Sequence, residues 1–233
     1  FTLANDQPIG LQLRKLRIIV KGEDGSEHPS IAGLLMASTD PRPWLPSAFI
    51  QCVAYRGENR DANEQMDAQD ISGPLDRQVI QALAFVERNM KTAAKKAVGR
   101  QDLPQYSIKA VFEALVNAVA HRDYAIHGAK IRLHMFSDRL ELASPGALAN
   151  TMEVGDMELR QSCRNELLAS LLARCKIDYP GVGRGLMMDK RGEGVPIITR
   201  ESETLSGQYP EYRMAGEEII LTIFAANPDT GAE

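Results

Sequence analysis

The sequence predicts an α+β fold, a two-layer α/β sandwich in which a mixed sheet is covered on one face by helices. β-prone and helical segments are intermixed along the 233 residues, which is typical of such a sandwich. Residues 130–136 and 139–144 alternate apolar and polar side chains around Ser137 and Asp138, which predicts a hairpin with a two-residue turn. The segment 108–121 is apolar around most of a helical circumference, so we expect it to be buried.

The first half of the chain predicts strands followed by a long helix. Residues 11–20 fit a short helix or an edge strand, and the polar stretch 22–30 fits a turn. From Pro74 apolar residues recur at helical spacing, which predicts a helix to about Val98 with a solvated, lysine-rich last turn. Three β-prone segments precede that helix, at residues 31–38, 48–57 and 66–72.

The second half begins with the buried helix 108–121, for which Ser107 provides an N-cap. After the hairpin, the pattern predicts a helix, a glycine-rich loop leading into a short helix, and a last strand, at residues 165–176, 181–194 and 217–226.

Composition limits the classes of function. The chain is 44% hydrophobic and 25% charged with a net charge of -4, so it lacks the basic surplus of a nucleic-acid binder. Three unclustered cysteines and four histidines show no metal-ligand spacing, and we expect reduced thiols in the cytoplasm. No apolar run approaches the roughly 18 residues of a membrane helix, so no membrane partner is expected.

We expect three regions along the chain. Residues 1–73 would form a strand-rich segment or small subdomain, residues 74–226 the main domain, and residues 227–233 a C-terminal tail. The first residues, FTLAN, contain neither Met nor a signal-peptide pattern, so we expect the chain to be cut from a longer protein.

A polar stripe interrupts the buried helix. Glu113, Asn117 and His121 follow each other at four-residue spacing, so they project from one side and are expected to face a polar cavity. A carboxylate and a carboxamide one turn apart can hold a hydrated divalent cation. Two alternatives remain open at this stage, a solvent-facing stripe and a Glu113 neutralised by a neighbouring arginine.

Three enzyme signatures are absent or incomplete. The sequence HRDY at 121–124 lacks the Asn and the later DFG of protein kinases. No G-x-x-x-x-G-K-[ST] motif occurs, which excludes a helicase motor in this chain. The glycine-rich stretch GVGRG, residues 181–185, offers backbone amides for phosphates but does not follow a clear strand, as the dinucleotide-binding fingerprint requires.

Several blocks in order resemble one protein family. They are IAGLLMASTDPRPWLPSAFIQCVAYRG, DISGPL, EALVNAVAHRDY, SDRLELASPGAL, SCRNELLASLL and GVGRG, spanning roughly residues 30 to 200. They resemble the C-terminal region of bacterial and archaeal proteins labelled transcriptional regulators or RecG-like ATP-dependent DNA helicases. That region is similar to the Bergerat, or histidine-kinase-like, ATPase fold of DNA gyrase, heat-shock protein 90, sensor histidine kinases and MutL. A Schlafen-type DNA-binding domain usually precedes it.

The resemblance implies roles for matching residues. Glu113 would orient the water that attacks the γ-phosphate of ATP, and Asn117 would ligate Mg²⁺. His121 and Arg122 end the same motif; Arg122 would reach a phosphate or form an ion pair with Asp123 or Asp138.

Two further motifs are implied by the same resemblance. Relatives carry an Asp-x-Gly-x-Gly motif whose Asp reads the adenine amino group. Ser144 stands at the position of that Asp, Gly146 at that of the first Gly, and Leu148 replaces the second Gly. The loop glycines would approach the phosphates, namely Gly181, Gly183 and Gly185.

The resemblance therefore implies an ATP-binding regulatory domain, with slow Mg²⁺-dependent ATP hydrolysis left open. Residues 74–226 would be the nucleotide-binding domain, DNA would be contacted only through domains outside this chain, and the domain would form a homodimer. The serine at position 144 supports an alternative, a degenerate scaffold for dimerisation or ligand sensing that does not bind ATP.

Overall fold

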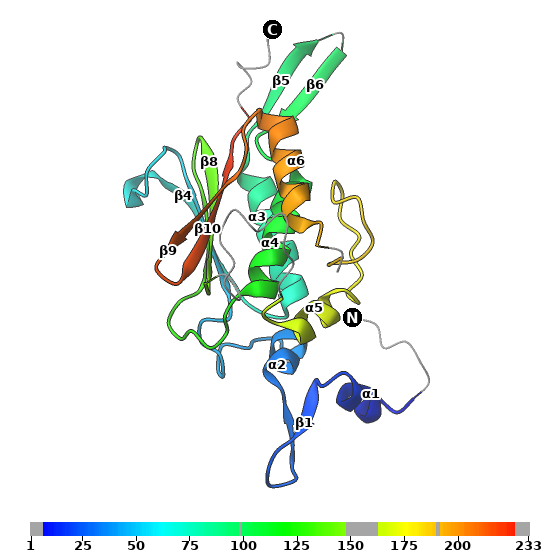
Figure 1. Ribbon diagram of the computed structural model, residues 1–233. Coiled ribbons are helices and arrows are strands. Elements are labelled where there is room, and N and C mark those ends of the chain that lie inside the picture. Colours follow the sequence, from blue (N-terminus) through cyan, green and yellow to red (C-terminus); the bar gives the residue numbers. More distant parts are fainter. Residues whose placement is uncertain (1–6, 98, 148–162, 190–191, 227–233) are drawn as a thin grey trace.

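A computed structural model describes residues 7–97, 99–147, 163–189 and 192–226 of the chain. It consists of two layers, with a six-stranded sheet on one side and helices on the other (Figure 1). Within the sheet the strand order is β4-β3-β7-β8-β10-β9, and all neighbours are antiparallel except the parallel pair β3 and β7. The predicted α+β sandwich with a mixed sheet is therefore confirmed. The strands are β3 (Ile50–Tyr55), β4 (Gln65–Ile71), β7 (Ile131–Met135), β8 (Arg139–Pro145), β9 (Glu211–Ala215) and β10 (Glu218–Phe224).

Four helices cover one face of the sheet, and α4 is the central one (Figure 1). Ten of its fourteen residues are buried, and it packs on α3, α5, α6 and strand β8. Its start is fixed by Ser107, whose hydroxyl accepts a hydrogen bond from the Ala110 N–H at 3.3 Å, as expected for an N-cap. The helices are α3 (Leu75–Asn89), α4 (Ile108–His121), α5 (Glu166–Leu172) and α6 (Gly194–Ser206).

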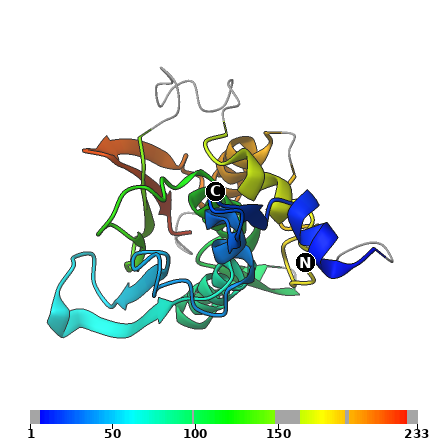
Figure 2. The same cartoon turned by 90° about the horizontal axis from the view of Figure 1, so that it is seen from below.

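The N-terminal part contributes both to the main sheet and to a small projection. Strands β3 and β4, linked through the short 3-10 helix η1 (Ala62–Glu64), form one edge of the six-stranded sheet. The preceding residues extend from the lower end of the body (Figures 1 and 2). The elements there are α1 (Ile9–Lys15), β1 (Ile19–Lys21), β2 (Glu27–Pro29) and α2 (Ile31–Ala37).

Residues 31–38, predicted as a strand, form helix α2, so this prediction was wrong. Short apolar runs fit a buried strand and a buried helix equally well, and capping decides between them. The Ser30 hydroxyl accepts a hydrogen bond from the Gly33 N–H at 2.9 Å, which begins the helix.

The helix that begins after Pro74 ends at Asn89, not near Val98, so its predicted end was also wrong. The Asn89 side chain donates hydrogen bonds to the Phe85 carbonyl and to Asp67 of β4, each at 2.9 Å. Contact with the sheet therefore stops the helix. A projecting hairpin follows, formed by β5 (Thr92–Ala97) and β6 (Gly99–Pro104), so the lysine-rich stretch is not a last helical turn.

Other elements follow the sequence closely. The hairpin of β7 and β8 turns at Ser137 and Asp138, where the Phe136 N–H donates to the Arg139 carbonyl at 2.8 Å. The last strand is β10, as predicted. Strand β9 was missed, although Glu211–Ala215 begins with alternating polar and apolar residues, because the segment is only five residues long and mostly exposed.

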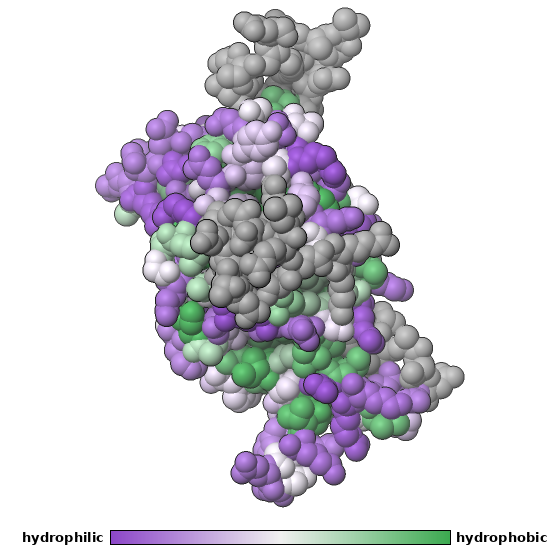
Figure 3. Space-filling model, viewed as in Figure 1, coloured by the Kyte–Doolittle hydropathy of each residue, from purple (hydrophilic) through white to green (hydrophobic). Residues whose placement is uncertain are grey.

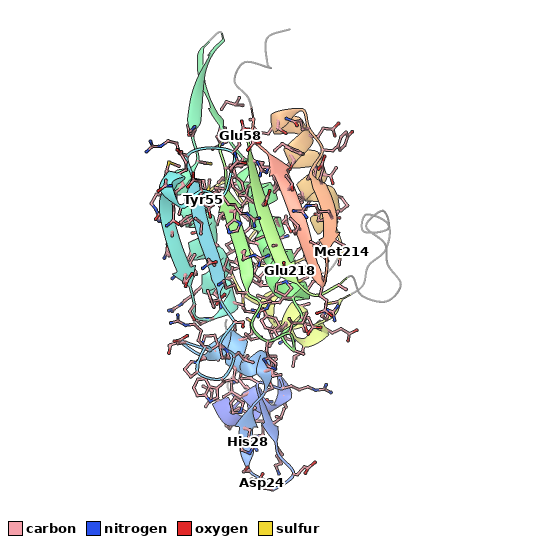
Figure 4. All side chains as sticks on the ribbon, turned by 90° about the vertical axis from the view of Figure 1, so that its left-hand side faces the viewer. Asp24, His28, Tyr55, Glu58, Met214 and Glu218 are labelled. Carbon is pink, nitrogen blue, oxygen red and sulfur yellow. The ribbon has the colours of Figure 1, made fainter. Side chains whose placement is uncertain are left out.

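The sheet face opposite the helices carries an ion pair and a pair of stacked aromatic rings (Figure 4). Arg132 of β7 reaches across β8 to Glu218 of β10, with 2.5 Å between nitrogen and oxygen. Tyr55 stacks on Phe136 with ring centroids 5.3 Å apart. On the face shown in Figure 3, hydrophilic residues predominate and hydrophobic residues reach the surface mainly at the lower end of the body.

One glycine sets how closely helix α2 packs against the segment that leads into strand β1. A methyl group at Gly33 would lie 2.2 Å from the Ile18 carbonyl oxygen, so the variant Gly33→Ala must move backbone. We expect it to lower the free energy of unfolding by about 1–3 kcal/mol, measured by urea denaturation. Gly57→Ala is the matched control, because its nearest atom would be 3.9 Å away, and it should change stability by less than about 0.5 kcal/mol. Equal stability of the two variants would contradict this packing.

Candidate nucleotide site

A cavity of about 820 Å³ lies among the helices and the sheet. Its walls come from α4, α5, the start of α6, and strands β8, β9 and β10. Five of the nine residues singled out from the sequence line it, namely Glu113, Asn117, His121, Ser144 and Gly146. The polar stripe of α4 thus faces a cavity, because the rest of this helix is packed against the sheet and its neighbouring helices.

Glu113 is the most buried of the three stripe residues, with 3% of its surface exposed. Its Oε1 atom lies 2.6 Å from Nη1 of Arg184, a residue of the GVGRG loop. Burial raises the pKa of Glu113, while the positive charges of Arg184 and Lys109 act to lower it. Glu113 therefore both pairs with a neighbouring arginine and lines the cavity, so these two expectations do not exclude each other.

Asn117 lies one turn further along α4 and faces the first residue of α6. A methyl group added at Gly194 would be 2.8 Å from the Asn117 Nδ2 and 3.1 Å from its Oδ1. No side chain caps the first turn of α6, so the positive end of this helix, with its backbone N–H groups, lies next to Asn117. Gly192 and Gly194 both line the cavity.

The glycines 192 and 194 were missed as candidates. Their sequence signal was a Gly-x-Gly directly before an amphipathic run with Pro196 in its first turn, which is a helix start. The GVGRG motif stands further from this helix, which begins nine residues after Gly185.

The three GVGRG glycines are not among the residues that line the cavity. Gly181 adopts φ 82° and packs against Ile108 at the start of α4, where an added methyl would lie 3.3 Å from the side chain. Gly183 adopts φ 76°. A methyl group added at Gly183 or at Gly185 would meet no atom within 4 Å. The loop instead delivers Arg184 to Glu113.

Ser144 and Gly146 close the other end of the cavity. The Ser144 hydroxyl donates to the Ala118 carbonyl of α4 at 3.1 Å. Gly146 has φ 121° and a methyl there would lie 3.0 Å from the Asp123 backbone nitrogen, so the turn requires glycine. Leu148, the third position of this motif, lies outside the described residues.

His121 lines the same end of the cavity. Burial is the main cause that lowers the pKa of His121, and the positive charge of nearby Arg164 lowers it further. Arg164 also pairs with Asp123 at 3.0 Å.

Arg122 does not line the cavity and is 2% exposed. Its guanidinium donates to the carbonyls of Ser47 at 2.6 Å and Ala129 at 2.8 Å, and it stacks over Tyr124. These contacts tie the end of α4 to two loops, so the pairing expected with Asp123 or Asp138 is replaced by backbone carbonyls.

The described residues contain no group of three or more His, Cys, Asp or Glu side chains that could hold a metal ion by themselves. An ion at this site would need further ligands from water or a bound phosphate. Within the same part of the chain, no helix is long and apolar enough to cross a membrane.

Comparison with known proteins finds one family model that matches part of the chain. Residues 128–223 match the model of a family described as "Putative ATP-dependent DNA helicase recG C-terminal". Glu113 and Asn117 precede the matched segment. No curated protein matches the chain.

Seven solved chains match, among them the crystal structure of the DIP2311 protein from Corynebacterium diphtheriae. The TM-score is 0.67 at 20% sequence identity, so the likeness shows the fold alone. The match covers 96% of this chain and 41% of that chain, so this chain corresponds to less than half of the DIP2311 structure. Residues 128–223, less than half of this chain, therefore resemble the RecG-like C-terminal family, which agrees with the resemblance drawn from the sequence.

Proposed function

We propose that the cavity binds an adenine nucleotide with Mg²⁺ and that the chain is the nucleotide-binding regulatory domain of a prokaryotic transcriptional regulator. The observation that carries this proposal is the placement of Asn117 and Glu113 on one cavity, with Asn117 facing the uncapped start of α6. ATP dependence is also part of the family description.

The residues at this end of the cavity fit a magnesium triphosphate. Mg²⁺ keeps several waters and takes one or two protein ligands together with substrate phosphates, so an isolated carboxamide is a sufficient protein ligand. Asn117 would supply its side-chain oxygen. The first backbone N–H groups of α6 would donate hydrogen bonds to phosphate oxygens at this positive helix end, and the glycine at position 194 leaves room for that approach.

Glu113 would act on water. When bound, Mg²⁺ would offset the negative charge of the phosphates. A carboxylate held at the cavity wall can accept the proton of a water that attacks the γ-phosphate, which is general-base catalysis. Hydrolysis would be slow wherever Glu113 is held away from that water.

The opposite end of the cavity fits a base. Leu142, Ile219 and Leu221 line the strand side of the cavity together with Ser144 and Tyr212, so apolar walls surround few polar groups there. Because Ser144 donates its proton to the Ala118 carbonyl, its oxygen remains an acceptor for an amino group.

A second candidate is a scaffold that keeps this fold for dimerisation or ligand sensing and does not bind ATP. Two observations favour it, the serine in place of the aspartate that reads adenine and the arginine paired with Glu113. In either case we propose that DNA is contacted through domains outside this chain, that the domain forms homodimers, and that it works in the cytoplasm.

Calorimetric titration of the chain with a non-hydrolysable ATP analogue tests the proposal. We expect binding that depends on Mg²⁺ and that weakens at least about tenfold in Asn117→Ala, because losing a metal ligand removes more than 1.4 kcal/mol of binding energy. Asn63→Ala is a suitable control, since Asn63 is exposed in η1, away from the cavity. An absence of heat with folded wild-type protein would rule out the proposal in favour of the scaffold.

The start of α6 gives a second, steric prediction. Gly194→Val would bring side-chain carbons within contact distance of Asn117, so we expect analogue affinity to fall at least about tenfold. Gly185→Ala is the control for this variant. A methyl group at Gly185 meets no atom within 4 Å, so we expect the analogue affinity to stay within about twofold of wild type. Unchanged affinity in Gly194→Val would show that nucleotide does not approach this helix start.

A further inference from the structure

We infer that Arg184 is a positioning residue that fixes the Glu113 carboxylate and keeps it ionised in the buried wall of the cavity. This inference rests on the proposed function, because the value of an ionised, oriented Glu113 is to accept a proton from water. It also gives a role to the GVGRG motif, whose glycines do not line the cavity.

The contact between the two side chains is close and oriented. Arg184 Nη1 lies 2.6 Å from Glu113 Oε1, and Arg184 Nη2 donates to the Met187 carbonyl at 2.5 Å. The same guanidinium lies over the Phe112 ring, 5.0 Å from its centroid. Contacts at both Nη atoms and at the face of the plane restrict the guanidinium to one orientation, which in turn selects one orientation of the carboxylate. The Nε atom of Arg184 is buried and has no hydrogen-bond partner among the described residues.

The loop that carries Arg184 is built to hold it. Val182 is buried, with 1% of its surface exposed. The Ile177 N–H donates to the Gly185 carbonyl at 3.0 Å, and the Met187 N–H donates to the Cys175 carbonyl at 2.9 Å. These bonds attach the residues that follow Arg184 to the segment after α5. The glycines with positive φ at 181 and 183 let the chain turn tightly enough to form this attachment.

Electrostatics point in the same direction. Burial is the largest influence on Glu113 and raises its pKa, and Arg184 is the largest influence that lowers it. Lys109, one turn earlier on α4, lowers the pKa further, although it is also engaged with Glu201 of α6 at 3.0 Å. Asp189 raises it. Removal of Arg184 therefore leaves a buried carboxyl whose protonated form, which cannot act as a base, is favoured.

Arg184 is not among the residues that line the cavity, whereas its partner Glu113 is. Any effect of Arg184 on a bound ligand therefore passes through Glu113. A phosphate-binding arginine would contribute to nucleotide affinity, whereas a positioning arginine would contribute to turnover. The two roles are separable by measuring affinity and hydrolysis in the same variants.

The test compares the full chain with Arg184→Met, Arg184→Lys and the control Arg200→Met, which removes a positive charge from exposed α6. We expect Arg184→Met to keep analogue affinity within about threefold, and to lose about tenfold or more of phosphate release at neutral pH. The acid limb of its pH profile should move to higher pH, since a raised carboxyl pKa delays ionisation. Arg184→Lys should recover most of the activity, and Arg200→Met should match wild type.

A second measurement decides the inference without turnover. Carbon NMR of labelled glutamate, with the Glu113 signal assigned from Glu113→Gln, should show the Glu113 midpoint at higher pH in Arg184→Met than in wild type. An unshifted midpoint, or affinity that falls as much as turnover, would overturn the positioning role. Failure of wild type to bind nucleotide would overturn the proposed function instead, and the Glu113 midpoint would still decide the role of Arg184.

Discussion

Burial of helix α4 is the constraint on which the rest of the structure depends. The helix is packed by the sheet on one side and by α3, α5 and α6 on others, and ten of its fourteen residues are buried. A carboxylate, a carboxamide and an imidazole cannot lie unpartnered in such an interior without a large cost in free energy. Glu113, Asn117 and His121 are tolerated there because packing leaves an open cavity along that one side of the helix.

The cavity has two chemically different ends. One end brings a carboxylate and a carboxamide next to the first turn of α6, where positive backbone dipoles favour an anion. The part lined by strands combines apolar residues with the hydroxyls of Ser144 and Tyr212. A molecule with a charged tail and a flat, weakly polar head matches this division, which is the physical basis for proposing a nucleotide over a small uncharged ligand.

The two glycine-rich segments show how a motif gains meaning from its surroundings. Both offer glycines before a helix in the sequence, yet only Gly192 and Gly194 line the cavity. The 181–185 loop packs behind Glu113 and attaches to the segment after α5, so its arginine becomes the counter-ion of the carboxylate. Backbone amides recognise phosphates only where the chain brings them to a ligand, and spacing alone does not specify that place.

The sequence by itself determined the layers, the buried helix with its polar stripe, the β7–β8 hairpin and the last strand, because these depend on local periodicity, capping and turn residues. Only the tertiary structure decided that α3 ends at Asn89 and that Arg122 binds the carbonyls of Ser47 and Ala129. It also decided that Arg184 meets Glu113 and that Gly194 meets Asn117. These contacts join residues about seventy positions apart, and their formation depends on how the helices pack on the sheet, which no local pattern encodes.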